Sequence, residues 1–226
     1  MKIYRTLGIA TVALVFMLSA AGAQASTVFD AGVDVSTGNC AFNNACGSAV
    51  GYPNYYAAQL FTLTDSSTLL SASIAIFNQA QGLPTTAYWQ ILAADGTGGL
   101  PGVMLASGVG DMLATTTHVG NVLGFSIDKQ YFNIGSVGLG RGSYYFAVHV
   151  ESPSYHNYLA SGSIGSGAAE HYDGAWHYNY REIPSVAVAL YGNVTAVPEP
   201  STYAMLLGGM VLLGFVARRH QGARGI

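Results

Sequence analysis

The middle of the chain alternates apolar and polar residues with a period of two, which is typical of strands that bury one face. The clearest run covers 143–151, where Tyr144, Phe146, Val148 and Val150 would share one face. Similar runs predict further strands over 27–35, 57–63, 67–78, 86–94, 102–107, 123–127 and 185–191. No stretch of this middle region keeps an apolar stripe at helical spacing.

Glycine-rich turn signals separate these runs. The strongest lie at 95–99, 138–142 and 173–174. We interpret 161–167 as a flexible Gly/Ser loop and 170–180 as an aromatic surface loop. Short strands joined by tight turns predict an all-β fold, as an antiparallel β-sandwich or jelly roll.

The N-terminus has the features of an export signal. Lys2 and Arg5 precede an apolar run over 7–20, and a small-x-small pattern then ends at Ala25. This order predicts a signal peptide that is cleaved between Ala25 and Ser26. A permanent N-terminal anchor is the alternative, and the apolar run is short for that role.

The C-terminus predicts a membrane span with a basic stop. Pro198 and Pro200 cannot continue a helix, and the segment 201–217 that follows carries no charge. As a helix it would rise about 26 Å, near the lower limit for a bilayer core. Arg218 and Arg219 follow directly and would stay cytoplasmic, which leaves the preceding domain across the inner membrane.

These elements together define the predicted organisation of the chain. Both predicted membrane segments agree on an exported middle region. The predicted parts are a signal peptide over 1–25, a β-sandwich ectodomain over 26–192, a linker with the Pro-Glu-Pro element over 193–200, a transmembrane helix over 201–217 and a basic cytoplasmic tail over 218–226.

The C-terminal pattern carries a resemblance. Pro198-Glu199-Pro200, an apolar stretch and then Arg218-Arg219 resemble the PEP-CTERM sorting signal, found in exported proteins of Gram-negative bacteria, many of which make exopolysaccharide and biofilm. The resemblance implies exosortase as the processing partner, besides signal peptidase and a transient stay in the inner membrane. It also implies delivery to the cell surface or the extracellular space. An ordinary anchor that is never cut is the alternative.

A weaker resemblance covers the middle of the chain. The segments 59–62, 89–92, 99–102 and 174–176 resemble the β-sandwich ectodomains called choice-of-anchor domains, which are often joined to such tails. These domains are similar in outline to jelly-roll carbohydrate-binding modules. The resemblance implies a fold more than an activity.

Charge and motif content narrow the functional classes. The chain has 226 residues, of which 8% are charged. Residues 26–197 hold ten carboxylates and three cations, a net charge of 3 − 10 = −7, which disfavours a nucleic-acid partner. The sequence has no Gly-x-Ser-x-Gly elbow and no phosphate-binding loop. We therefore expect no enzymatic activity and no cofactor.

Cys40 and Cys46 are the two cysteines of the chain. In an oxidising compartment such a pair is expected to form a disulfide. The alternative, a metal or redox pair, lacks the usual spacing and a second pair of ligands.

Aromatic residues are the best indication of binding. We single out Tyr155, Tyr172, Trp176 and Tyr178, because flat rings suit sugar rings and protein surfaces alike. Cross-strand packing without a ligand is the alternative. A metal site on His171, Asp173 and His177 is a weak hypothesis, since the spacing matches no known motif.

Three functions are therefore weighed. The first is a non-catalytic structural or adhesive surface protein, associated by resemblance with exopolysaccharide or biofilm matrix. The second is a carbohydrate-binding module. The third is a secreted hydrolase whose site has no recognisable motif.

Overall fold

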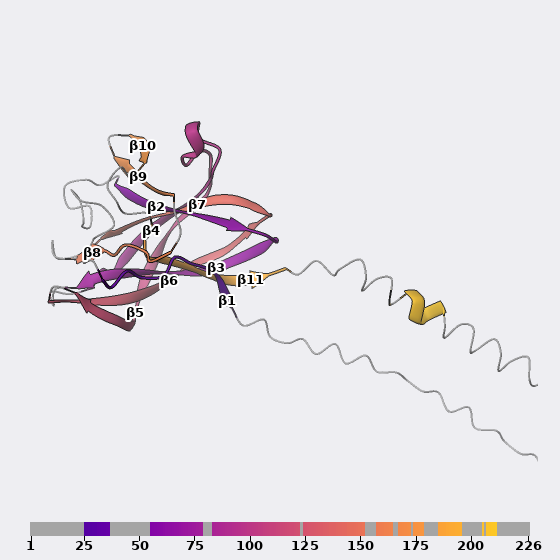
Figure 1. The fold of residues 1–226 in the computed structure, drawn as a ribbon, viewed down its shortest axis with the longest axis horizontal. Helices are drawn as coiled ribbons and strands as arrows, with labels where there is room; N and C mark the ends of the chain where they lie inside the picture. Colours follow the sequence, from indigo (N-terminus) through magenta and orange to yellow (C-terminus); the bar gives the residue numbers. More distant parts are fainter. Residues whose placement is uncertain are drawn as a thin grey trace, which may run out of the picture.

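The fold is described from a computed structural model and consists of antiparallel strands (Figure 1). The description covers residues 25–36, 55–78, 83–122, 124–151, 157–164, 167–172, 174–178, 185–195, 205 and 207–211. The elements are β1 (Ser26–Asp30), β2 (Tyr56–Leu63), β3 (Ser67–Asn78), β4 (Thr86–Ala93), the 3-10 turn η1 (Thr97–Gly99), β5 (Met104–Val122), β6 (Phe125–Leu139), β7 (Gly142–Glu151), β8 (Asn157–Leu159), β9 (Ala168–Tyr172), β10 (Ala175–Tyr178) and β11 (Val188–Val194).

These strands form one sheet of eleven strands. The order is β1-β11-β3-β6-β5-β4-β7-β2-β9-β10, with β8 also paired to β3. The prediction of an antiparallel all-β fold is confirmed. The finer prediction of a sandwich or jelly roll is not confirmed, because β5 joins all the strands into a single hydrogen-bonded sheet.

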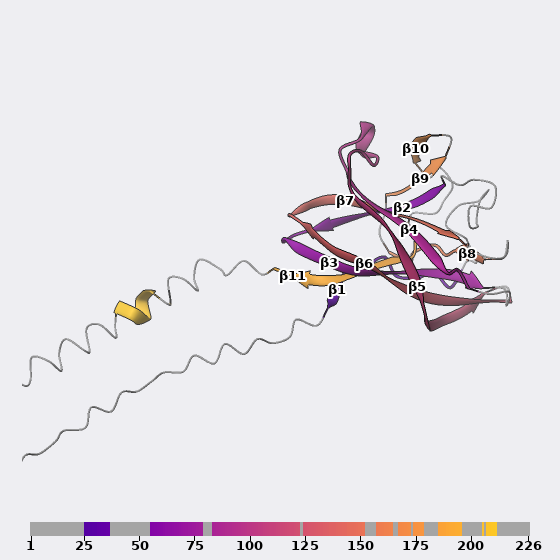
Figure 2. The same ribbon diagram turned by 180° about the vertical axis from the view of Figure 1, so that it is seen from behind.

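Strand β5 is the element that shapes this sheet. Its first half pairs with β4, from Met104 to Asp111, and its second half pairs with β6, from Met112 to Val122. A single apolar cluster takes buried residues from both halves of the sheet. The rings of Phe132 and Phe146, one from each half, lie 6.4 Å apart. The sheet therefore folds over its own inner face, as Figure 2 shows from behind.

Strands β5 and β6 are much longer than the sequence predicts, because glycines interrupt their alternation. Gly108 is required by packing, since a Cβ there would lie 2.7 Å from the Trp89 ring. A Cβ on Gly110 would lie 2.8 Å from the Asn133 carbonyl oxygen. Both glycines let β5 pass close to its neighbours, so they belong to the strand and do not end it.

The predicted surface loop over 170–180 is wrong for most of its length. Ala168–Tyr172 and Ala175–Tyr178 form the hairpin β9–β10. Gly174 supplies the left-handed backbone of its turn, with φ of 86°. The turn signal was read correctly, but the strands around it were too short to show a clear alternation.

The two ends of the described domain lie side by side. Ser26 of β1 pairs with Gly192 of β11. β11 continues to Val194, two residues past the predicted end of the domain, and the Thr195 amide donates to the Ser66 carbonyl at 2.8 Å. The first residue after the predicted cleavage and the strand before the sorting tail therefore share one edge of the sheet (Figure 1).

Several predicted features lie outside the described residues. They are most of the signal peptide, Cys40 and Cys46, the Pro198-Glu199-Pro200 element, Arg218 and Arg219, so their roles stay predictions. Within the predicted transmembrane segment, positions 205 and 207–211 are helical, and Met205 and Met210 are exposed. Among the described residues, none belongs to a helix with the length and apolar character of a membrane span.

Candidate functional site

A row of aromatic rings crosses five neighbouring strands of the sheet. We call it the aromatic row. It consists of Tyr88 on β4, His149 on β7, Tyr56 on β2, His171 on β9 and Trp176 on β10. Figure 1 shows these strands together at one end of the sheet.

Ring contacts along the row are continuous. The centroid distance is 5.5 Å between Tyr88 and His149, and 5.6 Å between His149 and Tyr56. It is 6.5 Å between Tyr56 and His171, and 5.0 Å between His171 and Trp176. The last two pairs meet edge to face, which is a favoured geometry for aromatic rings.

Strand register produces this alignment. Tyr88 pairs with His149, Tyr56 with His171, and His171 with Trp176. Their chain neighbours on the opposite face, such as Trp89, Val148 and Ala57, belong to the main core. The row therefore lies on the outer face of this half of the sheet.

The row is half-buried, apart from the imidazole of His149, which is buried. Tyr88, Tyr56, His171 and Trp176 are partly exposed, whereas His149 is 6% exposed. A ring nitrogen of His149, Nδ1, lies 2.8 Å from the Tyr55 carbonyl oxygen and must carry the proton to donate there. Burial raises the pKa of Tyr56, and a hydrogen bond with Gln90 lowers it in part. At neutral pH this phenol is therefore uncharged.

A small apolar cluster supports one end of the row. Ala58, Leu92, Tyr145, Ala147 and Ala169 are buried on this outer face, and Trp176 packs against them. Leu100, which directly follows η1, packs against the same cluster. The β9–β10 hairpin and η1 stand on the same side of the sheet in both views (Figures 1 and 2).

Two tyrosines hold η1 in place over this cluster. The Tyr145 hydroxyl donates to the Gly99 carbonyl at 2.9 Å, and the Tyr178 hydroxyl donates to the Gly98 carbonyl. Tyr145 belongs to β7 and Tyr178 to β10, so both strands fix the same turn. The position of η1 is thus set by hydrogen bonds from two strands, and Trp176 is held by packing against the cluster.

The four predicted ligand residues have different places in the fold. Trp176 is a member of the row, and Tyr178 bonds to η1. Tyr172 ends β9 opposite Ala175, but its side chain lies outside the described residues, as does all of Tyr155. The sequence analysis did not name Tyr56, Tyr88 or His149 as ligand residues. Tyr88 and His149 lie in the predicted strands 86–94 and 143–151, and Tyr56 directly precedes the predicted strand 57–63.

The metal hypothesis is not supported by the hairpin register. His171 pairs with Trp176, whereas His177 pairs with Glu170. Because cross-strand partners share a face and successive residues alternate, the two imidazoles lie on opposite faces. Within the described part of the chain, no three metal-ligating side chains form a group.

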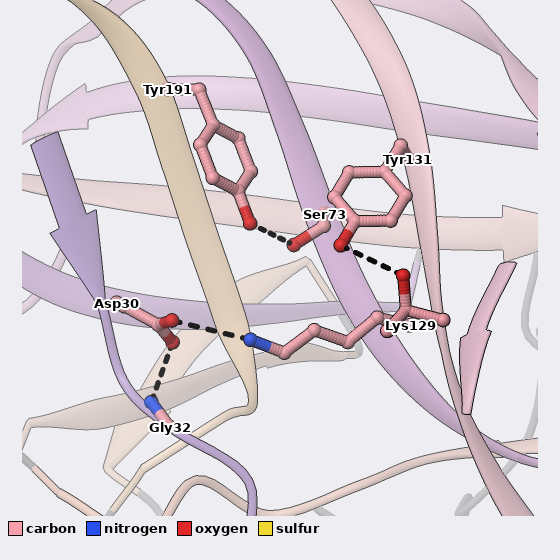
Figure 3. A network of polar contacts seen from close by, with 7 residues as sticks. Asp30, Gly32, Ser73, Lys129, Tyr131 and Tyr191 are labelled. Atoms are coloured by element: carbon pink, nitrogen blue, oxygen red, sulfur yellow. Dashed lines mark hydrogen bonds and ion pairs between the residues drawn. The ribbon is translucent and has the colours of Figure 1, made fainter. Parts of the chain in front are cut away.

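The outer face of the other half of the sheet carries polar contacts instead (Figure 3). We call them the polar network. Lys129 Nζ lies 3.2 Å from Asp30 Oδ2, and Asp30 Oδ1 accepts the Gly32 amide at 2.8 Å. The Tyr191 hydroxyl lies 3.1 Å from Ser73 Oγ.

A second tyrosine completes the polar network. The Tyr131 hydroxyl lies 3.3 Å from Thr117 Oγ1, and its ring lies 5.9 Å from that of Tyr191. Burial raises the pKa of Tyr191, with the Ser73 hydrogen bond opposing this. The Lys129–Asp30 contact joins β6 to β1 across β11 and β3, so the network fastens the N-terminal strand.

Comparisons with known proteins concern the C-terminal segment. Residues 196–219 match the PEP-CTERM protein-sorting motif. No curated protein matched the chain. The motif indicates an exported protein that exosortase sorts at the membrane of a Gram-negative bacterium. The motif match confirms the predicted sorting signal and, through it, exosortase as the processing partner.

Proposed function

We propose that this is a non-catalytic surface protein that adheres to neutral polysaccharide of the extracellular matrix through the aromatic row. The sorting motif supports the route to the surface. The row is the observation that carries the adhesive role, because it lines up five rings on an outward face, four of them partly exposed and the fifth, His149, buried between two of them.

The dimensions of the row fit a polymer. Neighbouring strands lie about 4.8 Å apart, so four intervals give a length of about 19 Å across the strands. Aromatic faces suit the C–H faces of sugars, and imidazole and phenol groups at the ring edges can exchange hydrogen bonds with hydroxyls. A linear glycan lying across the strands would contact several members at once.

The charges of the row and of the surrounding domain favour a neutral ligand. The members of the row include no carboxylate, lysine or arginine. The segment 26–197 has a net charge of 3 − 10 = −7, so an anionic polymer would be repelled. The absence of carboxylates from the row also supports a binding role over glycoside hydrolysis, which needs two of them.

The location of the row suits a tethered protein. The row occupies β4, β7, β2, β9 and β10, which end the strand order on one side. β1 and β11, which connect to the two chain termini, end it on the other. The ligand face and the sorting tail thus belong to opposite ends of the sheet.

The remaining parts of the proposal concern maturation and fold class. We include signal-peptide cleavage after Ala25, a Cys40–Cys46 disulfide and release or retention in a biofilm matrix. We also include the choice-of-anchor class, with a sandwich whose two layers share β5. The single apolar cluster between the two halves of the sheet supports a two-layered sandwich.

The test measures binding of the purified exported protein to an array of neutral glycans. Trp176→Ala removes the largest ring of the row, and Tyr131→Ala removes a ring from the polar network as the matched control. We expect the first variant to lose binding and the second to keep it. Equal binding by both variants, or no binding by the parent protein, would contradict the proposal.

A further inference from the structure

The first half of β5 has an open edge. From Met104 to Asp111 this strand pairs with β4 on one side, and among the described residues no strand pairs with its other side. β6 approaches β5 already at Gly110, but it pairs with β5 only from Met112 onward. The sheet therefore presents an unpaired edge at the point where its two halves separate.

The free backbone groups of this edge can be assigned. The Met112 amide donates to the Thr85 carbonyl at 2.9 Å. In an antiparallel ladder the direction of the amides alternates, so those of Gly110 and Gly108 also face β4. The amides and carbonyls of Ser107 and Val109 then point away from β4, toward the open side.

The side chains along this edge are apolar and exposed. Val109 is 61% exposed, Leu105 48%, Met104 54% and Val103 62%. Residues 103–110 contain no charged residue and no proline, which are the usual devices that protect an edge strand. A register shift near Leu105 leaves 106–111 as the regular part of the edge.

We propose that this edge pairs with the same edge of a second copy of the chain, so that two domains share one continuous antiparallel sheet. A copy of this chain fits for reasons of charge. The segment 26–197 has a net charge of 3 − 10 = −7, so two copies meet with the least repulsion along the uncharged positions 103–110 of this edge.

The two-fold axis of this pair passes through Gly108. Ser107 of each chain then lies opposite Val109 of the other, and these are the residues whose amides are free. Asp111 faces Leu105 of the other chain, so the two Asp111 carboxylates do not meet. Glycine at the axis leaves room for close approach, as it already does over Trp89.

Pairing would double the ligand face. Val109 pairs with Tyr88, the first member of the aromatic row, so the edge continues directly from that row. A two-fold axis perpendicular to the shared sheet puts both rows on one face. If the proposed glycan binding holds, the dimer gains avidity for a long polymer. The pairing itself does not depend on any ligand.

The experiment determines the oligomeric state of the full chain purified in detergent, without glycan, by light scattering over a range of concentrations. We expect a dimer, and we expect Val109→Lys to raise its dissociation constant at least tenfold. Ser107→Pro should have the same effect, because it removes an outward amide while leaving the ladder to β4 intact. Val35→Lys, at another exposed apolar position, is the matched control.

Cysteine cross-linking tests the register. Chains with Ser107→Cys and chains with Val109→Cys, carrying different tags and expressed together, should form a mixed disulfide. Ser107→Cys with Thr62→Cys is the control pair, and the parent chain gives the background from Cys40 and Cys46. A parent protein that stays monomeric at every concentration would overturn the proposal. The proposal would also be overturned if the Val109→Lys and Ser107→Pro chains dimerised as tightly as the parent chain and the Val35→Lys control.

Discussion

The two outward faces of the sheet use tyrosine in different ways. In the polar network the hydroxyls of Tyr131 and Tyr191 each bond to a side chain of a neighbouring strand. In the aromatic row Tyr56 and Tyr88 belong to an unbroken line of ring contacts with an imidazole between them, and Tyr56 also hydrogen-bonds to Gln90. The comparison teaches that hydroxyl pairing fastens strands, whereas a line of ring contacts builds a surface that sugars can cover.

The difference has a consequence for mutation. Loss of a network contact should lower the free energy of unfolding and leave glycan binding unchanged. Loss of a ring from the row should lower glycan affinity more than stability. The four predictions below test this separation, from the largest expected effect to the smallest.

Phe132→Ala should affect both faces, because the core beneath them is shared. Phe132 is fully buried, and its ring contacts that of Phe146 from the other half of the sheet. We expect a loss of about 3–5 kcal/mol in the free energy of unfolding. Urea denaturation followed by circular dichroism, which reports on the strands of both halves, measures it. A loss confined to one half, seen as two separate transitions, would show that the halves fold independently.

Tyr56→Ala should weaken glycan binding about tenfold, which corresponds to about 1.4 kcal/mol of lost ring contact. Tyr56 is the ring that connects His149 to His171, so its loss interrupts the row. Tyr56→Phe keeps the ring and should keep the affinity. Titration calorimetry with the best glycan from the array provides the comparison, and equal weakening by both variants would assign binding to the hydroxyl.

Lys129→Met should destabilise the protein by about 1 kcal/mol at low salt, with less effect at high salt. Lys129 is 18% exposed and Asp30 is 37% exposed, so water screens the pair only in part. Glycan affinity should not change. Arg141→Met, at an exposed position, is the matched control. A lower affinity in the Lys129 variant would contradict the separation of the two faces.

Tyr191→Phe should cost about 0.5–1.5 kcal/mol at pH 7, through the lost Ser73 hydrogen bond. The pH dependence of the free energy of unfolding tests the role of the Tyr191 hydroxyl further. Because burial raises the pKa of Tyr191 above the ordinary 10.0, the folded state holds its proton more tightly than the unfolded state. The contribution of Tyr191 to stability is therefore constant below pH 10 and falls as the pH rises toward the raised pKa.

Burial also raises the pKa of Tyr56 and of Tyr145, so the parent protein should lose stability over the same alkaline range. The Tyr191→Phe variant lacks one contributor, and its stability should fall less steeply above pH 10. Denaturation curves at several alkaline pH values measure the slope. An identical slope in both proteins would show that Tyr191 titrates alike in the folded and unfolded states.

Several strands could be read from the sequence because their residues alternate without interruption. Ser67–Asn78 has the predicted bounds, and Gly142–Glu151 and Thr86–Ala93 differ from their predictions by one residue each. β5 was underestimated because glycines that fit against aromatic rings look like turn signals in a sequence, and β6 because Gly135 and Gly138 interrupt its alternation. The short strands β9 and β10 were missed because so few residues show no reliable period.

The candidate site was predicted only in part for a related reason. Trp176 could be named as a ligand residue because aromatic residues are dense around it. Tyr56, Tyr88 and His149 come from separate parts of the chain, and only the pairing of β2, β4, β7 and β9 brings them into line. A shift of one residue in any pair would turn a ring into the core.

The sequence by itself determined that this protein is exported and sorted at the membrane, because a sorting signal is recognised through contiguous residues in a fixed order. It also determined that the middle region forms antiparallel strands, since alternation is a local property. Only the tertiary structure decided that rings from five strands form one row and that β5 joins two halves while leaving an edge open. Those features depend on register and on which strands become neighbours, and long-range packing sets both.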